Sequence, residues 1–84
     1  MSSERGSEYT TILVQPKREI SSAICIYKIK NNKPLKILME KYCLRIGLNR
    51  ESVRFLASNN VINEDDTVSS LNLENYSIIQ VLRR

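Results

Sequence analysis

The sequence contains no histidine and no tryptophan, and it has only two cysteines, two glycines and two prolines. Without histidine, a nucleophilic Cys43 would need an unusual general base, and no ordinary set of zinc ligands can be assembled. We recognise neither a Gly-rich phosphate loop nor a pair of carboxylates in an evident cleft. These absences argue against an enzyme and against a metal ion or other cofactor.

Long hydrophobic runs are also missing. No apolar stretch approaches the roughly 18–20 residues that a membrane helix needs. Residues 1–8 are polar and lack the apolar segment of a signal peptide. We therefore expect an intracellular protein without membrane association. Cys25 and Cys43 lie in apolar patterns and form no CxxC unit, which favours two buried free thiols over a disulfide.

The formal charge of +4 is unevenly distributed along the chain. Residues 28–50 carry Glu40 as their only acidic residue, against seven basic ones: Lys28, Lys30, Lys33, Lys36, Lys41, Arg45 and Arg50. Such a band favours an acidic partner, and a merely solvated face is the alternative interpretation. The aromatic residues are few and fall mostly in core patterns, so they offer nucleic acid little stacking surface. A protein partner is the better hypothesis.

Hydrophobic periodicity predicts the elements. Residues 1–8 should form a flexible tail, and residues 9–84 one domain. We expect strands at 9–15, 22–30, 53–57, 61–62 and 77–82, a turn at 58–60, an acidic loop at 63–67 and a short helical turn at 68–73. The strongest signal is a helix that starts with Pro34 at its first position, carries an apolar face over residues 35–46 and ends at Gly47 as a left-handed cap. Its apolar face consists of Leu35, Leu38, Met39, Tyr42, Cys43 and Ile46. A sheet packed on one helix is an α+β two-layer domain.

Several of these segments resemble the SUMO family of ubiquitin-like modifiers. Tyr27-Lys28-Ile29-Lys30 is similar to the end of the second SUMO strand, and residues 34–48 closely resemble the SUMO helix, including its Tyr-Cys-x-Arg-x-Gly ending. Residues 53–56, 62–67 and 71–74 are similar to the following strand, the acidic loop and the segment before the last strand. The resemblance covers residues 23–81 and implies the β-grasp fold, a mixed sheet of four to five strands on one helix.

The resemblance also implies two binding surfaces. A groove between the second strand and the helix would take SUMO-interacting peptides by strand addition, and the acidic loop, Glu64, Asp65 and Asp66, would contact the conjugating enzyme. The groove residues carried over by position are Cys25, Ile26, Tyr27, Ile29, Lys30, Leu38, Lys41, Tyr42 and Arg45. Leu38 and Tyr42 can equally be core residues, and the lysines and the loop can simply be solvated. Ile37 adds apolar surface near the groove. Lys17, in a Lys-x-Glu sequence, is a candidate acceptor lysine.

The chain departs from the family pattern in three places. Asn59-Asn60 replaces the usual Gly-Gln turn, the net charge is positive, and the Gly-Gly pair needed for conjugation is not found after Arg84. Two hypotheses stay open. In the first, the protein is a modifier of the nucleus and cytoplasm, attached to target lysines through activating and conjugating enzymes by a Gly-Gly pair outside this sequence. In the second, it is a SUMO-like domain that recruits the conjugating enzyme or other partners without conjugation. We expect a monomer in both cases.

Overall fold

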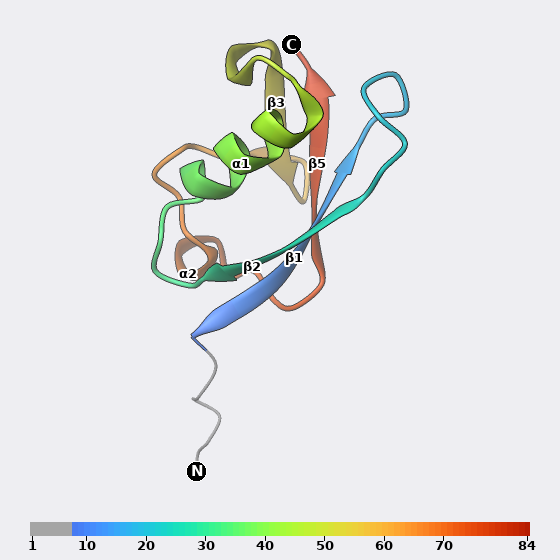
Figure 1. The fold of residues 1–84 in the computed structure, drawn as a ribbon. Helices are drawn as coiled ribbons and strands as arrows, with labels where there is room; N and C mark the ends of the chain where they lie inside the picture. Colours follow the sequence, from blue (N-terminus) through green and yellow to red (C-terminus); the bar gives the residue numbers. More distant parts are fainter. Residues whose placement is uncertain (1–7) are drawn as a thin grey trace.

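The computed structural model describes residues 8–84, which form a five-stranded sheet with one long helix packed across it (Figure 1). The elements follow in the order β1 Tyr9–Pro16, β2 Cys25–Lys30, α1 Lys36–Ile46, the 3-10 helix η2 Arg50–Ser52, β3 Val53–Ala57, β4 Asn60–Val61, α2 Val68–Leu71 and β5 Ser77–Arg83. The strand order is β2-β1-β5-β3-β4, with β1 and β5 parallel and the other neighbours antiparallel. The predicted α+β class, a mixed sheet on one helix, is confirmed.

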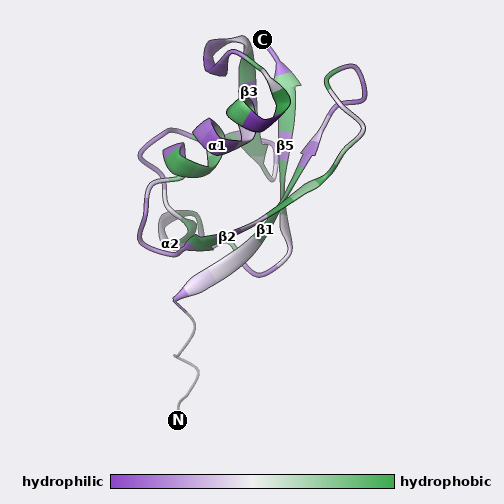
Figure 2. Cartoon of the chain, viewed as in Figure 1, coloured by the Kyte–Doolittle hydropathy of each residue, from purple (hydrophilic) through white to green (hydrophobic). Residues whose placement is uncertain are grey.

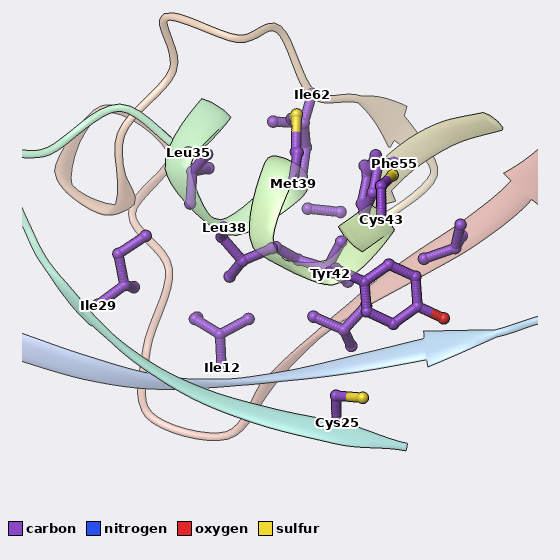
Figure 3. Packing of buried hydrophobic residues seen from close by; sticks show 14 of the residues in the cluster. Ile12, Cys25, Ile29, Leu35, Leu38, Met39, Tyr42, Cys43, Phe55 and Ile62 are labelled. Carbon is purple, nitrogen blue, oxygen red and sulfur yellow. The ribbon is translucent and has the colours of Figure 1, made fainter. Parts of the chain in front are cut away.

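The core lies between α1 and one face of the sheet (Figure 3). The predicted apolar face of α1 points into it, with Leu35, Leu38, Met39, Tyr42 and Cys43 at most 4% exposed and Ile46 partly buried. Alternate residues of β1, β3 and β5 meet this face from the sheet. Hydrophobic residues accordingly concentrate in α1 and the central strands, and hydrophilic residues in the connections (Figure 2). Each large apolar side chain buried here contributes about 1.5–3 kcal/mol, so α1 is a main source of stability.

The end of α1 is as predicted, but its start is not. Gly47 adopts the left-handed conformation at φ 82°, and the N–H groups of Gly47 and Leu48 donate to the carbonyl of Cys43 at 2.8 and 2.9 Å. At the other end, the prediction that Pro34 is the first helical residue is wrong, because the helix begins at Lys36 and Leu35 is its cap. The reason is tertiary, since the N–H of Leu35 donates to the carbonyl of Asp66 at 2.7 Å.

Local chemistry fixes the two short connections after α1. Ser58 and Asn59 have φ of 52° and 69°, the positive values that a tight hairpin turn between right-twisted strands requires. This turn starts β4 at Asn60, one residue earlier than predicted. Before α2, Thr67 accepts a hydrogen bond from the N–H of Ser70 at 2.9 Å, and the Ser70 hydroxyl accepts one from the N–H of Thr67 at 2.9 Å. This reciprocal pair is a capping box, which starts a helix of only four residues.

Other predicted bounds also differ from the structure: β1 ends at Pro16, α2 ends at Leu71 and β5 ends at Arg83. β2 begins at Cys25, not at residue 22, because residues 17–24 form the connection from β1 and only Cys25 onward pairs with it. The predicted tail, residues 1–8, lies outside the described residues except for Glu8. Cys25 and Cys43 are both free and buried, as predicted. No helix within residues 8–84 is long and apolar enough to cross a membrane.

A candidate peptide-binding groove between strand β2 and helix α1

β2 is an edge strand of the sheet. It pairs with β1 on one side, from Cys25 opposite Val14 to Lys30 opposite Tyr9, and no strand among residues 8–84 pairs with its other side. That free side runs next to α1 (Figure 1). Backbone N–H and C=O groups along such an edge are available to a further extended strand. The geometry therefore provides a template for strand addition beside a helix.

One part of the groove is a hollow between the second half of β2 and the first half of α1. Its volume is about 140 Å³, and its lining residues are Tyr27, Lys28, Ile29, Lys30, Lys33, Ile37, Leu38 and Lys41. Ile29 and Leu38 form its apolar floor, since they are 7% and 2% exposed and belong to the core cluster. Four lysines and no carboxylate surround that floor. The hollow combines aliphatic contact with an excess of positive charge.

A second hollow continues the groove past Tyr27. It is lined by Ala23, Ile24, Cys25, Ile26, Tyr27 and Arg45, so Tyr27 separates the two hollows and contributes to both. Burial is the main cause that raises the pKa of Tyr27, and the Arg45 guanidinium opposes part of this rise. A neutral phenol between these two hollows, with a cation nearby, is a contact surface for an uncharged peptide backbone and its aliphatic side chains.

The structure brings together eight of the nine groove residues named from the sequence: Cys25, Ile26, Tyr27, Ile29, Lys30, Leu38, Lys41 and Arg45. Tyr42 is the exception, because it is 0% exposed and lies in neither hollow. Its ring reaches from α1 into the core, with its edge against Phe55 (Figure 3). Burial raises the pKa of Tyr42 to about 12. Tyr42 is therefore a core residue and not a groove residue, whereas Leu38 belongs to both the core and the groove.

Ile26 differs from the other groove residues in orientation. Its neighbours Cys25 and Tyr27 face the helix layer, and Ile26, which is 67% exposed, alternates with them. Since successive side chains of a strand point to opposite faces, Ile26 presents its side chain to the outer face of the sheet while bordering the second hollow. The side chain of Ile26 therefore points mainly away from the groove floor.

Sequence reasoning missed two lysines of the first hollow. Lys28 alternates to the outer side of β2, and Lys33 belongs to the turn between β2 and α1, yet both line the hollow. Both lysines belong to the basic segment 28–50, which was the signal for them in the sequence. Only the path of the chain from β2 into α1 brings Lys33 beside Lys41. Ile37, 41% exposed, lies at this hollow as the sequence suggested. Lys30 also forms a surface ion pair with Glu8 at 3.8 Å.

The acidic loop lies against the start of α1, and its three carboxylates are not equivalent. Asp66 uses Oδ2 to accept a hydrogen bond from the N–H of Asn63 at 2.8 Å, within the loop itself. Glu64 lies 3.9 Å from Nε of Arg50, whose guanidinium stacks on the ring of Phe55 at 5.1 Å. Asp65 is exposed, and its side chain makes no ion pair with the described residues 8–84. A basic partner would therefore meet Asp65 first, and the role of this loop stays a prediction.

The remaining candidate residues lie apart from the groove. Lys17 is exposed after the end of β1, with its N–H bonded to the carbonyl of Val81 at 3.1 Å, and its role as an acceptor stays a prediction. Cys43 is 4% exposed, and burial raises the pKa of its thiol. Within residues 8–84, no group of three or more His, Cys, Asp or Glu residues could hold a metal ion.

Comparison with known proteins identifies the family and the fold of the chain. Residues 14–82 match the model of the family described as ubiquitin-2 like Rad60 SUMO-like. The chain belongs to this SUMO-like family. Among its relatives are the small ubiquitin-related modifier 2 of Homo sapiens and the small ubiquitin-related modifier 2-B of Xenopus laevis, each 40% identical over 58 residues. These matches cover 69% of this chain and 61% of each relative, so the matched region spans under two thirds of the relatives' length.

Solved structures show the same fold at low sequence identity. A ubiquitin of Caldiarchaeum subterraneum superimposes with a TM-score of 0.81 at 14% identity, over 90% of this chain and 94% of that one. A protein designed de novo from ubiquitin gives a TM-score of 0.79 at 16% identity, over 94% and 93%. The fold of this SUMO-like chain is therefore the ubiquitin-like β-grasp, as predicted.

Proposed function

We propose that this SUMO-like chain is a protein-recognition domain that receives an extended, aliphatic peptide with acidic flanking residues along the free edge of β2. One observation carries this proposal: the unpaired edge of β2 borders a hollow with an apolar floor of Ile29 and Leu38 and a rim of four lysines. Strand addition would supply backbone hydrogen bonds, and aliphatic side chains would enter the hollows on either side of Tyr27. The lysines would attract carboxylates next to the aliphatic segment.

The test is a titration of the whole chain with a synthetic Val/Ile-rich peptide carrying Asp or Glu on one flank, followed by calorimetry and by NMR of the amide groups. Tyr27→Ala and Lys30→Glu should each weaken binding about tenfold, a loss of about 1.4 kcal/mol, without unfolding the domain. Leu44→Ala is the matched control, because Leu44 is 84% exposed on α1 and lines neither hollow. Unchanged affinity in both groove variants would show that the peptide does not bind in the β2–α1 groove.

The same domain would also act as a covalent tag of the nucleus and cytoplasm, attached to target lysines through a Gly-Gly terminus by activating and conjugating enzymes. Membership of the SUMO-like family and the name of its relatives, small ubiquitin-related modifiers, favour this second role. Mass spectrometry of the native protein, recovered from its cells under denaturing conditions, tests it. Gly-Gly joined to lysines of other proteins would support the tag, whereas a native product without such linkage would leave a non-conjugated domain that recruits the conjugating enzyme or other partners.

A non-catalytic role is part of the proposal. Cys43 is the thiol that would have to serve as a nucleophile, but it is almost fully buried and its pKa is raised, so little reactive thiolate would form near neutral pH. Cys43→Ser should leave peptide binding within a factor of two. If the wild-type protein converted a substrate and Cys43→Ser lost that activity with its fold intact, the chain would instead be an enzyme.

A further inference from the structure

Three aliphatic side chains form a row on the outer face of the sheet, on the side away from α1. Leu13 of β1 lies opposite Ile26 of β2 and opposite Ile78 of β5 in the pairing register, so the row crosses three neighbouring strands. Ile26 is 67% exposed, Ile78 is 47% exposed, and Leu13 between them is half-buried. Their inward-facing neighbours Ile12 and Ile79 are at most 1% exposed, so the row is separate from the core.

The charge of this face is of one sign. Among the strand residues of 9–83 whose side chains alternate outward, the charged ones are Lys28 and Lys30 on β2 and Arg54 on β3, and none is acidic. Lys30 pairs with Glu8, which precedes β1. Lys28 lies two residues from Ile26 on the same strand and also approaches the ring of Tyr9, at 6.0 Å. A second copy of this face would oppose its own cations, which disfavours self-association. An acidic partner surface would complement these cations.

We infer that the row of Leu13, Ile26 and Ile78 is a docking site for an acidic amphipathic helix of another protein. Neighbouring strands are about 4.8 Å apart, so a row over three strands spans about 10 Å. Residues i, i+3 or i+4, and i+7 on one face of a helix span about 10.5 Å. A helix with aliphatic residues at these positions lays one side chain against each member of the row, and carboxylates on its flank reach Lys28. This site faces away from α1, and it shares Ile26 and Lys28 with the rim of the β2–α1 groove, whereas Leu13 and Ile78 line neither hollow.

The probe is a synthetic peptide of about five helical turns, with Leu or Ile at the i, i+3, i+4 and i+7 positions and Glu beside them. A peptide of the same composition in shuffled order is its control. Titrated into the isotope-labelled chain, the ordered peptide should shift the amide resonances of Leu13, Ile26 and Ile78. Ile26→Thr and Ile78→Thr should each weaken it about tenfold, while Val61→Thr, an exposed aliphatic on β4 outside the row, should not. Lys28→Glu should weaken it several-fold, and Lys36→Glu should not.

Four results would overturn the inference: no binding of the ordered peptide, equal binding of the shuffled one, unchanged affinity in both threonine variants, or resonance shifts confined to the groove. Two further measurements identify a different occupant. A dimer in sedimentation equilibrium that Ile26→Thr dissociates would assign the row to a second copy, and row-dependent cosedimentation with phosphatidylserine vesicles would assign it to a membrane surface. The Ile78→Thr variant should still bind the extended acidic peptide, because Ile78 does not line the groove. This measurement tests the groove separately, so a failure of one site can be told from a failure of the other.

Discussion

The ring of Tyr42 on α1 meets the ring of Phe55 on β3 edge to face, with centroids 5.9 Å apart and planes at 86°. Both side chains are at most 1% exposed, so this contact joins the helix layer to the sheet layer in the centre of the core. Such aromatic pairs contribute about 0.5–1.5 kcal/mol beyond their buried area. The hydroxyl of Tyr42 is buried and has no hydrogen-bond partner among the described residues. The ring, not the hydroxyl, stabilises the fold.

Tyr42→Phe should therefore leave the free energy of unfolding unchanged or raise it by about 1 kcal/mol, because a buried polar group without a partner is removed. Tyr42→Ala should lower it by about 3–5 kcal/mol, through lost burial and a cavity. Urea unfolding followed by circular dichroism measures both changes. A Tyr42→Phe variant destabilised by more than 2 kcal/mol would mean that the hydroxyl makes an essential contact.

The stability of the protein should also depend on alkaline pH through Tyr42. Its folded-state pKa of about 12 lies above the ordinary value of 10.0, so the unfolded chain loses the phenolic proton first as the pH rises. The contribution of the protonated Tyr42 phenol to the free energy of unfolding is fully present below about pH 10. It is lost as the pH approaches about 12, and the loss is roughly 2–3 kcal/mol at most. Lysines also titrate in this range, so the measurement is the difference between the wild type and Tyr42→Phe. Parallel curves for the two proteins would contradict the prediction.

Gly47→Ala should destabilise the protein by about 1–2 kcal/mol, the cost of a left-handed conformation for a residue with a Cβ. An added Cβ would meet nothing within 4 Å, so the effect comes from the backbone at φ 82° and not from a clash. Asn tolerates this conformation better than Ala. Gly47→Asn should therefore lose about half as much, measured by thermal unfolding. Equal losses in both variants would indicate a steric cause instead.

The capping box of α2 should contribute about 1 kcal/mol to the free energy of unfolding. Thr67→Ala removes the acceptor for the N–H of Ser70, and such cap substitutions cost about 0.5–2 kcal/mol. Thr67→Ser keeps the hydroxyl and should cost only a few tenths of a kcal/mol. Hydrogen exchange of the Ser70 amide gives a local measurement beside global unfolding, and unchanged exchange in Thr67→Ala would show that the cap contributes nothing.

Binding of an acidic peptide in the groove should weaken as salt is added, because four lysines and no carboxylate line the first hollow. Lys41→Gln should lower the affinity several-fold at low salt and reduce its salt dependence. Lys17→Gln, the same change at an exposed lysine outside both hollows, should alter neither. An affinity independent of salt would mean that the apolar floor alone selects the peptide.

Local pattern predicted the strands and the long helix of this protein, but not the 3-10 helix η2. The spacing of apolar residues defined the buried face of α1, and Gly47 defined its end, because both depend on neighbours within a few residues in sequence. The start of α1 could not be predicted in this way. Leu35 is held by the carbonyl of Asp66, and no rule of local sequence relates two residues so far apart.

The sequence by itself also determined which residues could form a groove, since the resemblance of residues 27–30 and 34–48 to one family names a strand and a helix. Only the tertiary structure decided how these residues are used. Strand order left β2 at the edge, the turn before α1 brought Lys33 to the lysine rim, and packing against Phe55 placed Tyr42 in the core. Register across β2, β1 and β5 aligned Ile26 with Leu13 and Ile78 on the outer face. The physical reason is that exposure and neighbourhood arise from contacts between distant segments, whereas periodicity records only local geometry.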